Sequence, residues 1–204
     1  MANEYRTKAI VTEPYRMAFP ALLAPVEKDN GKIQYEMILL IPKTDTEGLG
    51  KIKGIIRDAI KARWGDNNPP KGLVIPLNDG DEKDWEGFAG HYYIRCASTF
   101  QPGFIDRQKR PIRDPNLVYG GAWVRAHIDA YSWVHQASGK KGVSIGLNNV
   151  LFWKEDESFG GTNSADDAFA EYTSSDAPES DDPAAYAGSD DAGVQEANDP
   201  LADF

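Results

Sequence analysis

The stretch Gly-Ala-Trp-Val-Arg-Ala-His-Ile-Asp-Ala-Tyr-Ser-Trp-Val, residues 121–134, decides the fold class. Successive side chains of an extended strand point to opposite faces. Small, mostly apolar residues occupy the even positions: Ala122, Val124, Ala126, Ile128, Ala130, Ser132 and Val134. Rings alternate with charged and polar groups at the odd positions: Trp123, Arg125, His127, Asp129, Tyr131 and Trp133. The stretch therefore predicts a β-strand with one core face and one mixed face.

The mixed face suits unpaired bases. A base stacks on a flat ring for about 1–3 kcal/mol, and a neighbouring cation attracts its phosphate. In the alternative interpretation, the rings form the second core face of a two-sided sheet, because Trp and Tyr are common in strands for packing reasons alone. Charge and the neighbouring segments favour the first interpretation.

Charge is divided unevenly along the 204 residues. The net charge of −10 argues against a nucleic-acid partner when taken over the whole chain. Residues 155–204, however, hold 15 of the 32 acidic residues and no Lys or Arg, which leaves 17 acids against 22 bases in residues 1–154. The body therefore carries +5 and the tail −15, as expected for a basic binding domain with an acidic appendage.

Length and composition indicate one domain with its own core. We expect no membrane span, because no apolar run approaches 18 residues, and the N-terminus shows no secretory leader. The single cysteine, Cys96, lies in an apolar strand pattern and is expected to be a packed residue in a reducing cytosol.

Periodicity predicts a mainly β chain with one α-helix. The helix is expected at 44–63, with Thr44 or Asp45 capping its start. The expected strands cover 5–11, 15–23, 32–41, 90–99, 121–134 and 143–153. Residues 5–23 form one bent strand or two, and the alternation from Val143 to Trp153 is expected to face the core.

Two further segments repeat the combination of rings and cations. Tyr93 and Arg95 lie on one face of the strand at 90–99, like Trp123 and Arg125. The loop at 100–120 holds aromatic residues and a dense basic cluster: Phe104, Tyr119, Arg107, Lys109, Arg110 and Arg113. Like charges packed this closely repel unless a partner neutralises them, so the cluster is expected to contact phosphates.

The sequence does not indicate catalysis. The histidines and Cys96 lack metal-ligand spacing, and no Ser-His-Asp set is evident. Carboxylates such as Asp79, Asp81 and Asp129 do not form a recognisable two-metal array, so a nuclease is a weak alternative. We therefore expect no catalytic residue, no metal and no cofactor.

The acidic tail, residues 155–204, is rich in Asp, Glu, Ser, Ala, Gly and Pro. This composition buries too little apolar area to offset the entropy of ordering, so the tail is expected to be disordered. It ends in Asp203-Phe204, and an apolar tip on an acidic tail is typical of a docking peptide for partner proteins.

The order of several motifs resembles a family of phage single-stranded-DNA-binding proteins with one OB fold, long catalogued as a domain of unknown function. The matching stretches are Ile-Pro-Lys-Thr-Asp at 41–45, Ala-Gly-His-Tyr at 89–92, Val-Tyr-Gly-Gly-Ala-Trp-Val-Arg at 118–125 and Gly-Val-Ser-Ile-Gly-Leu-Asn at 142–148. The tail, with Phe204 after Asp203, separately resembles the acidic C-termini of single-stranded-DNA-binding proteins, which recruit replication partners and compete for the DNA groove.

This resemblance implies a five-stranded, partly open barrel over 1–154, with an extra strand allowed by the periodicity. It implies a non-enzymatic protein that coats single-stranded DNA without strong sequence preference, during phage replication or recombination in the cytoplasm of the infected bacterium. The expected partners are single-stranded DNA and, through the tail, replication proteins; a homo-oligomer is compatible with this hypothesis. The alternative is a carbohydrate-binding β module that uses the same rings, although neutral sugars require neither the basic loop nor the charge split.

Overall fold

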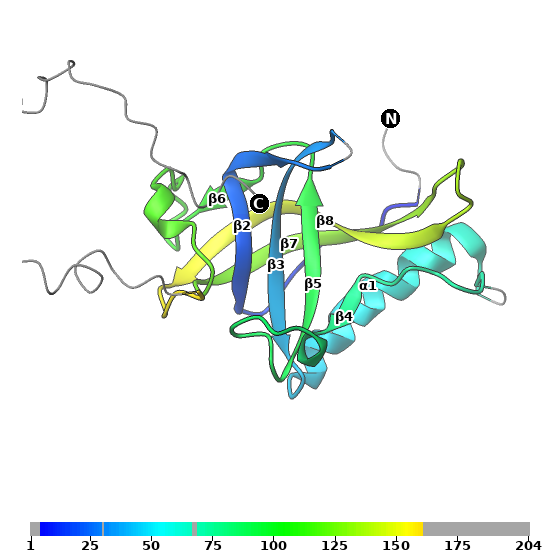
Figure 1. The fold of residues 1–204 in the computed structure, drawn as a ribbon, viewed down its shortest axis with the longest axis horizontal. Coiled ribbons are helices and arrows are strands. Elements are labelled where there is room, and N and C mark those ends of the chain that lie inside the picture. The colour runs from blue at the N-terminus through cyan, green and yellow to red at the C-terminus, as the bar shows by residue number, and fades with distance from the viewer. Residues whose placement is uncertain (1–4, 30, 67–68, 161–204) are drawn as a thin grey trace, which may run out of the picture. The chain divides into compact units, whose positions relative to one another are not determined.

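The computed structural model describes residues 5–29, 31–66 and 69–160. The helices are α1 (Thr46–Trp64) and the single 3-10 turns η1 (Gly80–Glu82) and η2 (Pro115–Leu117). The strands, in chain order, are β1 (Ile10–Val11), β2 (Tyr15–Glu27), β3 (Ile33–Pro42), β4 (Leu77–Asp79), β5 (His91–Ser98), β6 (Gly103–Ile105), β7 (Trp123–Val134) and β8 (Lys141–Lys154) (Figure 1). The prediction of a mainly β chain with one long helix is confirmed.

Five of the strands close into a barrel. Neighbouring strands follow the order β7-β2-β3-β5-β8, and β8 pairs back with β7. All of these pairs are antiparallel except β5 with β8, which are parallel through Cys96 and Ile145. This order is that of the five-stranded OB barrel. The short strands β1, β4 and β6 lie outside the ring and supply the extra strands.

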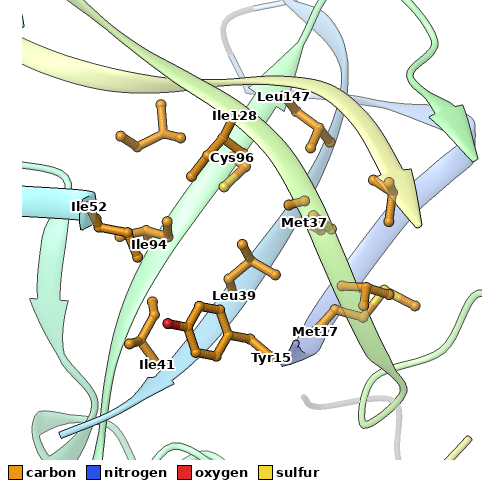
Figure 2. Close-up of a cluster of buried hydrophobic side chains, with 14 of the residues drawn as sticks. Tyr15, Met17, Met37, Leu39, Ile41, Ile52, Ile94, Cys96, Ile128 and Leu147 are labelled. Atoms are coloured by element: carbon orange, nitrogen blue, oxygen red, sulfur yellow. The ribbon is translucent and has the colours of Figure 1, made fainter. Parts of the chain in front are cut away.

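The barrel interior is lined by the residues that alternate inward. Six of the seven even positions of 121–134 are buried, and Val134 is half-buried near the hairpin end. Side chains from all five barrel strands meet Ile52 of α1 in this core (Figure 2). Cys96 is completely buried among them, and burial raises the pKa of its thiol, which agrees with a packed residue.

Helix α1 begins at a cap that also joins it to the barrel. The Asp45 carboxylate accepts a hydrogen bond from the backbone N–H of Gly48 at 2.9 Å, as an N-cap requires. The Tyr15 hydroxyl of β2 donates to the other Asp45 oxygen at 2.6 Å. Gly48 is needed here, because a Cβ atom at that residue would lie 1.8 Å from the Tyr15 oxygen. One side chain therefore fixes the start of the helix against the barrel.

Strand β8 does not keep the expected alternation from Val143 to Trp153. Its register with β7 shifts so that Asn148 and Trp153 are extra residues, each without a directly opposed partner. An extra residue of this kind is a β-bulge, and it reverses the faces of the residues that follow. Val150 is therefore buried, whereas Asn149 is exposed and Trp153 is half-buried. The prediction that Asn149 and Trp153 face the core is wrong.

The compact body continues past β8. The chain divides into two compact units, residues 1–161 and 162–204. Residues 155–160, which the sequence analysis assigns to the tail, contact the body through Asp156 and Phe159. The rest of the tail, including Asp203 and Phe204, lies outside the described residues. Within the described part, no helix is both long and apolar enough to cross a membrane.

The cap at Asp45 predicts an acid-sensitive contribution to stability. The Tyr15 hydroxyl and the Gly48 N–H hold the pKa of Asp45 below its usual value. A lowered pKa stabilises the folded state above the unfolded value of about 3.9, and this stabilisation is lost as pH falls through the folded pKa. We expect Asp45→Asn to be less stable than the parent protein at pH 7 and the difference to be smaller at pH 2, because the stabilisation is lost progressively below the unfolded pKa. Urea unfolding at both pH values measures it, and a pH-independent difference would contradict the explanation.

Candidate nucleic-acid interface

A groove crosses the outer face of β3 and β5 and is bounded by the far half of the β7–β8 hairpin. Two adjoining hollows of about 650 and 310 Å³ make up this β3–β5 groove, and they share Lys32, Gln34, Ala97 and Tyr131 in their walls. The β7–β8 hairpin projects beyond the barrel and passes over α1 (Figure 1). It thereby brings the rings of Tyr131 and Trp133 to the same groove as Arg95.

Both rings are held in place by neighbouring groups. The Trp133 indole N–H donates to the Ser144 hydroxyl at 2.9 Å. Gly142 lies directly opposite Trp133, where a Cβ atom would approach the indole to 2.7 Å. The Arg6 guanidinium lies 5.1 Å from the centre of the Tyr131 ring and is bonded to Asp129 at 3.1 Å. The groove therefore offers two fixed aromatic surfaces beside a fixed cation.

A carboxylate, Glu36, organises the cations on the other side of the groove. Lys28 donates to it at 2.5 Å, Gln34 donates at 2.7 Å, and Arg95 bonds through two nitrogens. Burial acts to raise the pKa of Glu36, but the hydrogen bonds from Lys28, Arg95 and Gln34 outweigh it and keep the pKa below its usual value. The carboxylate stays charged, and the two cations around it leave a local excess of positive charge.

A second group of rings and cations lies at the opposite end of β7. Arg107 and Arg125 both lie over the Trp153 ring, at 4.8 and 5.0 Å from its centre. Arg125 also bonds to Glu13 at 3.2 Å. Trp133 follows Trp123 by ten residue steps along β7, which is about 33 Å at the usual rise. The single mixed face expected from the sequence is thus divided into two groups.

The basic loop forms a small hairpin beyond β6. Its turn is closed by a hydrogen bond from the Lys109 N–H to the Asp106 carbonyl at 2.9 Å, and Lys109 has a left-handed φ of 64°. Arg110 is paired with Asp106 at 2.7 Å, whereas Arg107 stacks on Trp153. Arg113, three residues after Arg110, is exposed. The loop presents its cations to solvent, as the sequence indicates.

Trp123 and Tyr119 are engaged by the start of the acidic tail. The Trp123 indole N–H donates to the Asp156 carboxylate at 2.6 Å, and this bond, with the Glu157 N–H, lowers the pKa of Asp156. The Tyr119 hydroxyl donates to the Asp156 carbonyl and accepts from its N–H, both at 3.1 Å. The structure thus brings these two rings to residues 155–160, the tail root, and not to the β3–β5 groove.

Two other predicted binding residues pack against aromatic rings of the protein. The Phe104 ring is 4% exposed and lies in the core against Phe152. The Tyr93 ring packs edge-on against Phe88 at 5.3 Å, in a small second cluster on the outer face of the barrel. The expectation that Phe104 offers its ring to a base is incompatible with this burial, and Tyr93 is not part of the β3–β5 groove.

The sequence does not indicate several residues of the interface. Arg6, Lys32 and Gln34 reach the groove from segments far from residues 121–134. Trp153, in the second group, is turned outward by the bulge. Nothing in their local sequence signals this placement, apart from the alternation that puts Lys32 and Gln34 opposite the core side of β3. Among the described residues, no three His, Cys, Asp or Glu side chains are arranged to hold a metal ion.

A family model and a known phage protein both match most of this chain in sequence. A family model described as the ssDNA-binding protein of Enterobacter phage Enc34 matches residues 7–181. A putative protein p50 of Acyrthosiphon pisum secondary endosymbiont phage 1 is 31% identical over 159 residues, which are 72% of this chain and 83% of that protein.

Solved structures show the same relationship. The Enc34 single-stranded DNA-binding protein in complex with ssDNA matches with a TM-score of 0.61 and 26% identity, over 75% of this chain and 90% of that one. The T7 single-stranded DNA-binding protein gp2.5, at 12% identity and a TM-score of 0.54 over 74% of this chain and 94% of that one, shares the fold. The extent of the family match identifies the chain as a member of the Enc34 ssDNA-binding protein family.

Proposed function

We propose that this protein binds single-stranded DNA in the β3–β5 groove and coats it without catalysis, during phage replication or recombination inside the infected bacterium. The observation that carries the proposal is the convergence of Tyr131 and Trp133 with Arg6 and Arg95 in one groove of an OB barrel. Support comes also from the family, because the Enc34 protein has been solved in complex with ssDNA.

In the proposed mode, bases stack on Tyr131 and Trp133 while phosphates lie toward the cations. Stacking tolerates any base, because every base has a flat face, so the ring pair provides affinity without strong sequence preference. Arg6 and Arg95 are already held by Asp129 and Glu36, so they lose little side-chain freedom when DNA binds. Lys28 lies beside Arg95 and adds charge to the same wall.

The second group extends the proposed path to the other end of β7. Arg107, Arg125 and Trp153 combine two guanidinium groups with one ring, and Lys109 and Arg113 lie on the adjoining loop. These cations are proposed phosphate contacts. A strand of DNA that touched both groups would follow the length of β7.

The acidic tail has two proposed roles. Asp203 and Phe204 would dock on replication proteins, and the tail would compete with DNA for the basic body. Residues 161–204 number 44, so the tail can span at most about 150 Å, far more than the body measures along β7. Of the −15 carried by residues 155–204, −12 lies beyond Gly160, and such a tethered segment acts on a basic groove at high effective concentration.

We expect mutation of Trp133 to weaken DNA binding strongly and mutation of Trp123 to weaken it little. Trp133→Ala removes a stacking surface worth about 1–3 kcal/mol, so affinity for a short mixed-sequence single strand should fall at least fivefold. Trp123→Ala is the matched control, because Trp123 bonds to Asp156 instead of facing the groove. Fluorescence anisotropy of a labelled oligonucleotide measures both, and equal losses would contradict the assignment of the groove.

The phosphate contacts predict a defined salt dependence. Each neutralised phosphate of a single strand contributes about −0.7 to the slope of log K against log salt. Arg95→Ala and Arg113→Ala should each make the slope shallower by about 0.7. Arg57→Ala, on the exposed side of α1, should leave it unchanged. A titration at four salt concentrations gives the slopes, and a flat plot for the parent protein would refute phosphate binding.

The competition by the tail predicts that its removal tightens DNA binding. The cut belongs after Gly160, since Asp156 and Phe159 contact the body. This truncation should raise the affinity for single-stranded DNA at low salt, and the gain should shrink at high salt because the competition is electrostatic. Unchanged affinity at low salt would remove self-competition and leave partner docking as the role of the tail.

A further inference from the structure

The larger hollow of the β3–β5 groove, of about 650 Å³, has an unusual lining of amide side chains. Gln34, Gln101, Asn148 and Asn149 all contribute to its wall, beside the ring of Tyr131. A primary amide carries both a donor and an acceptor, so its orientation decides which of the two a ligand meets. The hydrogen bonds of Gln34, Gln101 and Asn148 show a common orientation.

The two glutamines direct their nitrogens into the protein. Gln34, which is only 7% exposed, donates from its amide nitrogen to the Glu36 carboxylate at 2.7 Å. Gln101 donates from its nitrogen to the carbonyls of Leu22 and Leu23, at 3.4 and 3.3 Å. Every one of these partners is an acceptor only, so neither amide can be reversed without setting oxygen against oxygen.

Asn148 behaves in the same way. Asn148, the extra residue of the first β8 bulge, donates from its amide nitrogen to the Asp129 carboxylate at 2.9 Å. Asn149 lies with its amide 3.2 Å from Nδ1 of His127, a ring nitrogen that is a donor in one tautomer and an acceptor in the other, so the common orientation is that of the other three amides. The Asp129 side chain is buried and bonded to Arg6, so the orientation of Asn148 is fixed by a charge within the protein.

The wall of the hollow therefore presents amide oxygens as hydrogen-bond acceptors, next to the cations Arg6 and Lys32. The amide nitrogens of Gln34, Gln101 and Asn148 are used within the protein, which leaves their oxygens as the groups that a ligand can meet. A base is best bound by these amides if it brings donors. Among DNA bases, adenine, cytosine and guanine carry an exocyclic amino group, whereas thymine presents two carbonyl oxygens and one ring N–H.

We propose that this hollow binds a single unstacked base through its exocyclic amino group and so favours adenine, cytosine or guanine over thymine. The base lies against Tyr131 while its amino group donates to the amide oxygens. This inference rests on the proposed function and adds a modest preference to a groove that otherwise accepts any base by stacking.

The test compares two ligands that differ in one amino group. The full chain is titrated with a short deoxyadenosine homo-oligomer and with the same oligomer of purine deoxyriboside, which lacks the 6-amino group but keeps the ring and the charge. Competition against a labelled strand in fluorescence anisotropy gives the ratio of affinities. We expect the amino-bearing oligomer to bind about fivefold more tightly, the gain from one hydrogen bond of ordinary net strength.

A variant assigns the preference to the hollow. Asn148→Ala should lower the affinity ratio toward one, and Asn116→Ala, an exposed asparagine of η2, should preserve the ratio. Equal, salt-dependent binding of both oligomers by the parent protein would overturn this inference and leave the proposed function standing. Failure to bind either oligomer would overturn both. The comparison on the parent protein decides the matter even if Asn148→Ala does not fold.

Discussion

Strand β7 is hydrogen-bonded along both edges, and the groove depends on this double pairing. Its start closes the barrel against β2, where Tyr15 pairs with Val124, while β8 follows its whole length on the other edge. The contact with β2 ends early, and β1 and Arg6 take over that edge farther along. The second half of β7 therefore extends beyond the barrel. This extension brings Tyr131 and Trp133 to the outer face of β5.

The groove is built from charges that are already paired, which changes how its cations act. Arg95 and Lys28 share Glu36, and Arg6 shares Asp129 with Asn148. Each pairing lowers the local charge, but it also holds the cation in one place before any phosphate arrives. The cost of ordering a long side chain is then met during folding and not during binding. The paired cations attract DNA less strongly at long range, but they form a contact surface that is ordered before DNA binds.

The alternation at 121–134 predicts the core face correctly. In a regular strand, the face on which a side chain lies depends only on its own position in the sequence. The same rule fails in β8, where the bulges at Asn148 and Trp153 reverse the faces, since a bulge depends on the partner strand and not on the local pattern. The basic neighbours of Phe104 predict a place in the interface, yet its ring completes the core. Partners far along the chain, such as Asp156 for Trp123, cannot be inferred from spacing at all.

The tail root limits how the acidic tail can affect the groove. Asp156 is held by Trp123, and Phe159 lies under Arg16 at 4.1 Å, both at the end of β7 away from Trp133. That end is about 33 Å from the stacking rings by strand rise, several times the screening length of about 8 Å at physiological salt. The fixed carboxylates of the root therefore cannot repel DNA from the groove through space. Any competition must come from residues beyond Gly160 that return to the groove along the chain, so the root serves as a fixed point of attachment and not as the competitor.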